Sequence, residues 1–154
     1  MRAKPPLSLR ARALAWLARR EHSRAELKRK LIVVARADGR EAEVEPLLQW
    51  LEAERHLSND RFAESRVHAR AARLGLRRIE SELRENGLDL PAAARAELAA
   101  GELQRAREVW RRKFGAPPAT PGERARQQRF LLGRGFAPDV VHRTLGSGRD
   151  GPDD

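Results

Sequence analysis

Residues 68–83, HARAARLGLRRIESEL, contain two helix-forming segments joined at Gly75. After the glycine, Ile79 follows at four residues and Leu83 at eight, a spacing that places both side chains on one face of a helix. Glycine commonly ends a helix because it adopts backbone conformations that other residues avoid. The stretch therefore predicts a helix–turn–helix unit with its turn at Gly75.

The same pattern occurs twice more, in LARREHSRAELKRKL (17–31) and RFLLGRGFAPDVVHRTL (129–145). Ser23 and Ala137 take the place of Gly75 in these two stretches. The apolar residues at the same intervals are Leu27 and Leu31 in the first stretch and Val141 and Leu145 in the second. Arginines precede all three turns: Arg19 and Arg20, Arg73, and Arg134. One unit used three times predicts stacked helical hairpins.

Helical periodicity extends along the chain, and no stretch predicts a strand. The helices are expected over roughly 8–20, 23–37, 43–55, 60–73, 76–86, 90–100, 102–114, 122–133 and 138–145. We predict an all-α fold, an elongated array of about nine helices in three tandem three-helix repeats. The repeats are expected at 9–56, 57–100 and 101–146, between a basic N-terminal lead-in (1–8) and a disordered acidic tail (147–154).

Local motifs add detail to this prediction. Ser23 and Glu26 match a capping box, in which each side chain bonds a main-chain N–H at the start of a helix. Asn59 or Asp60 is expected to cap the fourth helix, with Phe62, Ala63, Ala69 and Ala72 facing inward. Six aromatic residues are expected to anchor the core rather than stack on bases: Trp16, Trp50, Phe62, Trp110, Phe130 and Phe136.

The composition favours a polyanionic partner. Charged residues make up 35% of the 154 residues, and the net charge is +10. Such a chain suits nucleic acid, an acidic protein surface or an anionic membrane, although a solvated basic surface is the simpler alternative. The longest apolar run is LIVVA (31–35), and arginines interrupt the N-terminal apolar stretch, so neither a membrane span nor a signal peptide is expected. We therefore expect a cytoplasmic protein.

Signals for catalysis and metal binding are weak. The absence of cysteine excludes disulfides and thiolate metal sites. The histidines at 22, 56, 68 and 142 are far apart in the sequence, and GSGRDG (146–151) lacks the strand–loop–helix setting of a phosphate loop. Glu80, Glu82 and Glu85 are expected to pair with arginines. The sequence predicts a protein that is not an enzyme and has no metal or cofactor.

The stretch LSNDRFAESRVHARAARLGLRRIESELRENGL (57–88) resembles the middle repeat of the RecX family. ALAWLARREHSRAELKRKL (13–31) resembles the first repeat of that family, and residues 129–145 resemble the last. The resemblance implies a monomeric, non-enzymatic protein that binds RecA and the RecA–single-stranded DNA filament. It also implies inhibition of strand exchange and ATP hydrolysis in DNA repair and the SOS response, with weak nonspecific DNA binding. Arg66 departs from the family pattern, which often has an aromatic residue there.

Eleven basic residues near the predicted turns form a candidate binding face for RecA or DNA: Arg19, Arg20, Arg24, Lys28, Arg66, Arg70, Arg73, Arg77, Arg78, Arg129 and Arg134. Arg66, Arg70 and Arg73 share one stripe of a helix, where like charges repel unless a partner neutralises them. Two hypotheses stay open: a RecX-like regulator of RecA, or a nonspecific DNA-binding helical module without a recombinase partner. A base-reading helix is disfavoured because glutamates alternate with arginines in RRIESELREN (77–86).

Overall fold

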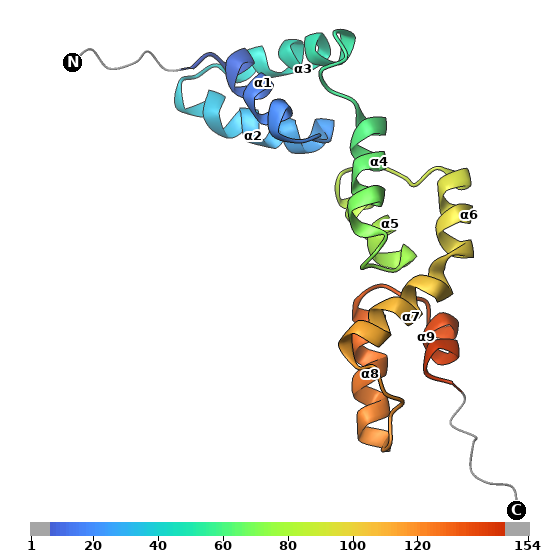
Figure 1. The fold of residues 1–154 in the computed structure, drawn as a ribbon. Coiled ribbons are helices and arrows are strands. Elements are labelled where there is room, and N and C mark those ends of the chain that lie inside the picture. Colours follow the sequence, from blue (N-terminus) through green and yellow to red (C-terminus); the bar gives the residue numbers. More distant parts are fainter. Residues whose placement is uncertain (1–6, 147–154) are drawn as a thin grey trace, which may run out of the picture. The chain divides into compact units, whose positions relative to one another are not determined.

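The structure, a computed structural model, describes residues 7–146. The predicted tail at 147–154 and residues 1–6 of the lead-in lie outside this range. Within it the chain forms helices, turns and loops and no strand, which confirms the predicted all-α class. The elements are α1 (Leu9–Arg19), α2 (Arg24–Ala37), a 3₁₀ helix η1 (Glu41–Glu43), α3 (Val44–Ala53), α4 (Asn59–Arg70), α5 (Leu76–Glu85), α6 (Ala92–Ala100), α7 (Glu102–Lys113), α8 (Pro121–Gly133) and α9 (Pro138–Leu145) (Figure 1).

The described residues divide into two compact units. Unit 1 consists of residues 7–65 with 86–88, and unit 2 consists of residues 66–85 with 89–146. The division falls within α4, which contributes its first part to unit 1 and its last part to unit 2.

In unit 1, α2 packs against both α1 and α3 (Figure 1). Its core is aliphatic, and the fully buried side chains include Leu27, Leu31 and Leu48. Ser23 ties the start of α2 to a distant segment: its hydroxyl accepts from the Glu26 N–H (3.0 Å) and donates to Asn86 Oδ1 (2.8 Å). The Ser23 half of the predicted capping box is thereby confirmed, whereas the Glu26 carboxylate pairs with Arg20 (2.5 Å) instead of returning to the helix start.

In unit 2, α7, α8 and α9 pack together around Leu131, Phe136 and Val141 (Figure 1). Trp110 is half-buried and donates from Nε1 to the buried Gln127 carbonyl (2.8 Å). Because an indole N–H is costly to bury without an acceptor, this bond fixes how α7 and α8 pack.

The three predicted turns lie where the sequence pattern placed them. Ser23 and Ala137 are the N-cap residues of α2 and α9, and Gly75 directly precedes α5. The apolar residues four and eight positions after each turn are all buried: Leu27, Leu31, Ile79, Leu83, Val141 and Leu145. The spacing common to the three stretches therefore marks the buried face of the helix that follows each turn.

The prediction for α4 was wrong in two respects. Ser58 caps the helix, because its hydroxyl accepts from the Arg61 N–H (3.2 Å), while Asn59 accepts from the Arg24 N–H (2.8 Å). The helix ends at Arg70, and Ala69 and Ala72 are exposed rather than buried. Small alanines give little driving force for burial, so the large Phe62 decides which face is inward.

Two of the three turns dock on each other inside unit 2. The Gly75 N–H donates to the Arg134 carbonyl (2.8 Å), and the Arg77 N–H donates to the Gly135 carbonyl (3.2 Å). A Cβ added at Gly75 would lie 2.3 Å from the Gly135 carbonyl carbon and oxygen. A Cβ added at Gly135, which has φ +90°, would lie 2.4 Å from Arg78 Cβ and 2.5 Å from the Arg78 nitrogen. Glycine is required at both positions because the two backbones touch where side chains would otherwise stand.

A distant carboxylate completes the α4–α5 turn. Oε1 of Glu102, which is almost fully buried at the start of α7, accepts from the Leu76 N–H at the start of α5 (3.1 Å). This bond satisfies an N–H that the helix itself leaves without a partner, and it places a negative charge at the positive end of the α5 dipole.

Candidate functional site

The basic residues predicted in unit 1 are mostly engaged by carboxylates. The pairs are Arg20 with Glu26 (2.5 Å), Arg24 with Glu45 and Glu52, and Lys28 with Glu45 (3.5 Å). The hydrogen bond to Glu45 raises the pKa of Arg24, more than burial lowers it. Of the four candidates in this unit, the exposed Arg19 alone forms no ion pair within residues 7–146. Unit 1 therefore offers a polyanion little uncompensated charge at the predicted positions.

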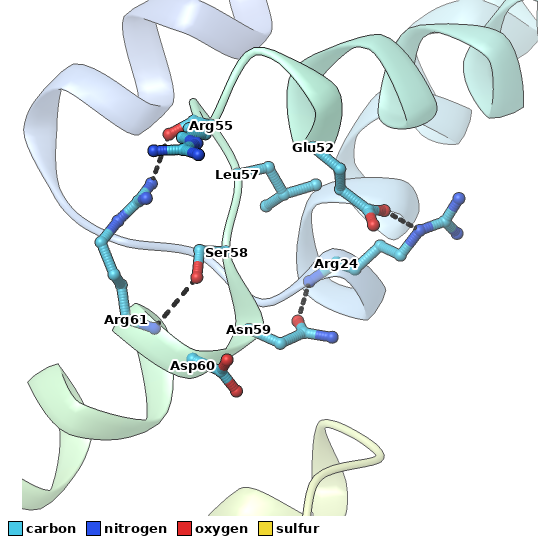
Figure 2. Close-up of a pocket in the computed structure, with 8 residues that line it drawn as sticks. All are labelled: Arg24, Glu52, Arg55, Leu57, Ser58, Asn59, Asp60 and Arg61. Atoms are coloured by element: carbon cyan, nitrogen blue, oxygen red, sulfur yellow. Dashed lines mark hydrogen bonds and ion pairs between the residues drawn. The ribbon is translucent and has the colours of Figure 1, made fainter.

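A pocket of about 370 Å³ lies in unit 1, at the junction of α2, the end of α3 and the start of α4. Figure 2 shows the residues that line it. Arg61 spans one side, where its guanidinium donates to the Arg55 carbonyl (2.8 Å) (Figure 2). The same guanidinium also pairs with Glu21 (2.9 Å). Arg24 closes the other side through its bonds to Asn59 and Glu52. Because Arg24 and Arg61 already have partners within unit 1, the pocket is better explained as a set of contacts that hold these helices together than as a ligand site.

His22 is buried in the turn between α1 and α2, directly before the N-cap Ser23. Nδ1 lies 3.0 Å from the Arg20 carbonyl, and Nε2 lies 2.8 Å from Lys30 Nζ. The neutral ring with its proton on Nδ1 satisfies both contacts, since the ammonium can only donate. Burial lowers the pKa of His22; the Arg20 carbonyl and Glu26 oppose this shift, and the charges of Arg20 and Lys30 add to it.

The lowered pKa predicts a pH-dependent stability. The unfolded chain takes up a proton at His22 below about pH 6.5, whereas the folded chain resists it. The contribution of His22 to the free energy of unfolding is therefore fully present above about pH 6.5. It declines as the pH falls toward the folded pKa, by at most about 1.4 kcal/mol per pH unit. Urea unfolding followed by tryptophan fluorescence at several pH values measures this decline. We expect His22→Gln to flatten it, while the exposed His142→Gln should leave it in place.

In unit 2, part of the predicted arginine stripe is compensated. Arg70 pairs with Glu82 on α5 (3.5 Å), and Arg66 also takes part in an interaction. The interpretation of Arg66, Arg70 and Arg73 as an uncompensated stripe is therefore wrong for Arg70. The pairing of Arg70 with Glu82 links α4 to α5. The spacing of residues within one helix cannot predict such a contact.

The docked turns bring four other predicted residues together. Arg73, Arg77, Arg78 and Arg134 lie within three residues of the Gly75–Gly135 contact, and all four are exposed. None of them forms an ion pair with a carboxylate of residues 7–146; the Arg134 guanidinium instead lies over the Phe130 ring (5.0 Å). We call these four residues the turn arginines. Arg129, also exposed, belongs to α8 and not to this cluster.

The prediction of basic residues near turns missed the last turn of α7. Arg111, Arg112 and Lys113 are all exposed there, and Arg111 pairs with Glu108 (2.5 Å). The run was visible in the sequence, but cations in a last helical turn are common because they complement the helix dipole. The position of Arg112 and Lys113 near Arg73 and Arg134 depends on the packing of α7 against α8 and α9, which no local pattern reveals.

The described part of the chain shows neither a candidate metal site nor a candidate membrane-spanning helix. Between residues 7 and 146 there is no group of three or more histidine or acidic side chains that could hold a metal ion. No helix in that range combines the length and apolar character needed to cross a membrane.

Comparison with known proteins assigns the chain to a family. Residues 100–145 match the family model described as RecX, third three-helix domain. A protein of Ralstonia nicotianae named Regulatory protein RecX is 54% identical over 144 residues, which cover 92% of this chain and 89% of the relative. The chain belongs to the RecX family. A RecX relative from Herbaspirillum seropedicae shows the same identity and coverage.

Solved structures of RecX proteins share the fold. A crystal structure of RecX from Lactobacillus salivarius superposes with a TM-score of 0.66 at 18% identity, covering 89% of this chain and 92% of that one. A second crystal structure of a regulatory protein RecX gives a TM-score of 0.61 over 94% of this chain. The all-α architecture is thus that of RecX structures, and the matches to proteins named as regulators agree with a regulatory role.

Proposed function

We propose that this chain binds RecA and the RecA–single-stranded DNA filament and inhibits strand exchange and ATP hydrolysis, so that it acts in DNA repair and the SOS response. Family membership supports the regulatory role, and the turn arginines supply a surface for an anionic partner. Guanidinium groups bind both phosphate and carboxylate in bidentate fashion, so one surface can serve DNA and an acidic protein face.

The observation that carries this proposal is the exposure of four arginines without carboxylate partners around one backbone contact in a RecX-family chain. The scaffold beneath them is rigid because the two turns share hydrogen bonds and leave no room for side chains. Because the backbone is already fixed, the conformational entropy lost on binding is mainly that of the arginine side chains.

The proposal is tested by DNA-dependent ATP hydrolysis of the cognate RecA. We expect addition of this chain at substoichiometric amounts to lower the steady-state rate, because a filament-bound inhibitor affects more than one RecA subunit. An excess of this chain that leaves both hydrolysis and filament assembly unchanged would refute the proposal.

A further inference from the structure

A pocket of about 450 Å³ lies in unit 2, beside the turn arginines. Five basic side chains line it: Arg73, Arg105, Arg112, Lys113 and Arg134. Glu108 is the one carboxylate among the described lining residues, and it already pairs with Arg111 (2.5 Å). The pocket therefore carries a strong excess of positive charge, and focusing of the field in a concave site increases its attraction for an anion.

Apolar side chains form another part of the lining. Val109 of α7 and Phe130 of α8 are half-buried, and Ala72 lies in the turn after α4. Water in contact with such a surface is released when an apolar group covers it, which favours binding of a ligand that has its own apolar part. A free inorganic anion would leave this surface unused.

Arg105 adds a partly buried positive charge to the lining of the pocket. Its Nη1 donates to the Leu98 carbonyl (2.9 Å), which fixes the guanidinium, whereas Nε and Nη2 are covered and have no hydrogen-bond partner in residues 7–146. Burial lowers the pKa of Arg105, and the attraction of Glu102 offsets this only in part. A partly buried charge that Glu102 offsets only in part makes the entry of an anion favourable, since the local dielectric constant is below that of water.

The aromatic ring in the pocket is poorly suited to a nucleobase. Lys113 Nζ and the Arg134 guanidinium lie over Phe130, at 5.6 and 5.0 Å from the ring centre. Phe114 also packs against this ring at 87°, with 5.3 Å between the centres. Stacking on an open aromatic face supplies much of the affinity for single-stranded nucleic acid, and here it would have to displace existing contacts. The chemistry thus favours a protein segment.

We propose that this pocket is a docking site for an acidic segment of a partner protein, with an apolar side chain between its carboxylates. The carboxylates would pair with Arg112 and Lys113 and with two of the turn arginines, Arg73 and Arg134, while the apolar side chain covers Val109 and Ala72. The proposal rests on the proposed function and deepens it, because it names the chemistry by which the regulated protein is recognised.

Direct binding of a probe peptide tests this site without RecA. The probe is a short fluorescein-labelled peptide in which aspartates flank a Leu-Phe pair, and fluorescence anisotropy with the full chain gives its affinity. A matched peptide with Ser-Ser in place of Leu-Phe is expected to bind at least about tenfold more weakly, because it cannot cover the apolar lining. Equal affinity for the two peptides overturns the proposal and does not depend on any variant folding.

A double charge reversal tests the location. We expect Arg112→Glu with Lys113→Glu to weaken binding of the Leu-Phe peptide at least about tenfold. Arg107→Glu with Arg143→Glu changes the net charge equally at two exposed residues outside the pocket and is expected to change the affinity by less than about threefold. Circular dichroism verifies that both variants are helical. Equal effects of the two pairs would mean nonspecific attraction and would overturn the proposal.

Competition separates a protein partner from nucleic acid. We expect an oligothymidylate to leave the peptide bound at concentrations where the unlabelled peptide displaces it. Displacement by the oligothymidylate that depends on Arg112 and Lys113 would identify a nucleic-acid site and contradict the proposal. If the chain inhibits RecA but does not bind the peptide, the docking site fails and the proposed function stands; the reverse result rejects the function alone.

Discussion

Replacement of Gly75 by alanine is expected to lower the free energy of unfolding of unit 2 by about 3 kcal/mol or more. The new Cβ would lie 2.3 Å from the carbonyl carbon and oxygen of Gly135 and 2.4 Å from the Phe136 nitrogen. All three are backbone atoms, so no side-chain rotation relieves the clash. The turns must separate, which breaks the hydrogen bonds from Gly75 to Arg134 and from Arg77 to Gly135.

Gly133 supplies the matched control for this prediction. It lies two residues before Gly135, at the end of α8, and a Cβ added there meets nothing within 4 Å. Gly133→Ala is therefore expected to leave stability unchanged or to raise it by up to about 1 kcal/mol, since alanine favours the helix. Urea unfolding monitored by circular dichroism compares the two variants with the parent chain. Similar stabilities for Gly75→Ala and Gly133→Ala would show that the turns do not dock as described.

Reversal of three turn arginines is expected to have the largest effect on function. The variant Arg73→Glu, Arg77→Glu, Arg134→Glu should raise the concentration for half-maximal inhibition of RecA ATP hydrolysis at least about tenfold. Each of these side chains is exposed and without a carboxylate partner in the described structure, so the substitution removes charge that a partner would use. Arg70 is a less suitable target, because its ion pair with Glu82 would be lost at the same time.

A control with the same change in charge is available in the same unit. Arg107, Arg126 and Arg143 are exposed on α7, α8 and α9, outside the docked turns. Their combined replacement by glutamate is expected to lower the inhibitory potency much less, because only the long-range attraction decreases. If both triple variants lose potency equally, the turn arginines have no special role and net charge alone explains the effect.

Salt dependence then distinguishes RecA from DNA as the partner of this surface. If the turn arginines bind phosphates, their reversal should reduce the slope of log affinity for single-stranded DNA against log salt by up to about 2. An unchanged slope together with lost inhibition would assign these residues to a protein contact. This comparison decides between the regulator and the nonspecific DNA-binding module.

The sequence predicted the helices and the apolar residues that follow each turn at four and eight positions, because both depend on local spacing. Ile79 and Leu83 follow Gly75 at intervals that only one helix face satisfies, and both are buried. The extent of α4 was less predictable, because alanine is compatible with either side of a helix. Ser58, Asn59 and Asp60 are all good caps, and the choice of Ser58 depends on the bond between Asn59 and Arg24, 35 residues away in sequence.

The candidate surface was predicted in part. Its arginines could be recognised from their positions near turns, but which of them remain unpaired is decided by long-range contacts such as Arg70 with Glu82. The approach of two glycines from α4–α5 and α8–α9 is likewise invisible in either stretch alone. Sequence spacing therefore identifies the turns, and packing selects the residues that are available to a partner.

Capture of RecA tests the central claim most directly. Immobilised chain is incubated with the cognate RecA, with and without single-stranded DNA and a nonhydrolysable nucleotide, at a salt concentration that suppresses nonspecific DNA binding. We expect RecA to be retained in both cases, and the Arg73→Glu, Arg77→Glu, Arg134→Glu variant to retain much less than the variant at 107, 126 and 143. If the parent chain retains DNA but no RecA under either condition, the account of this protein as a RecA regulator is contradicted.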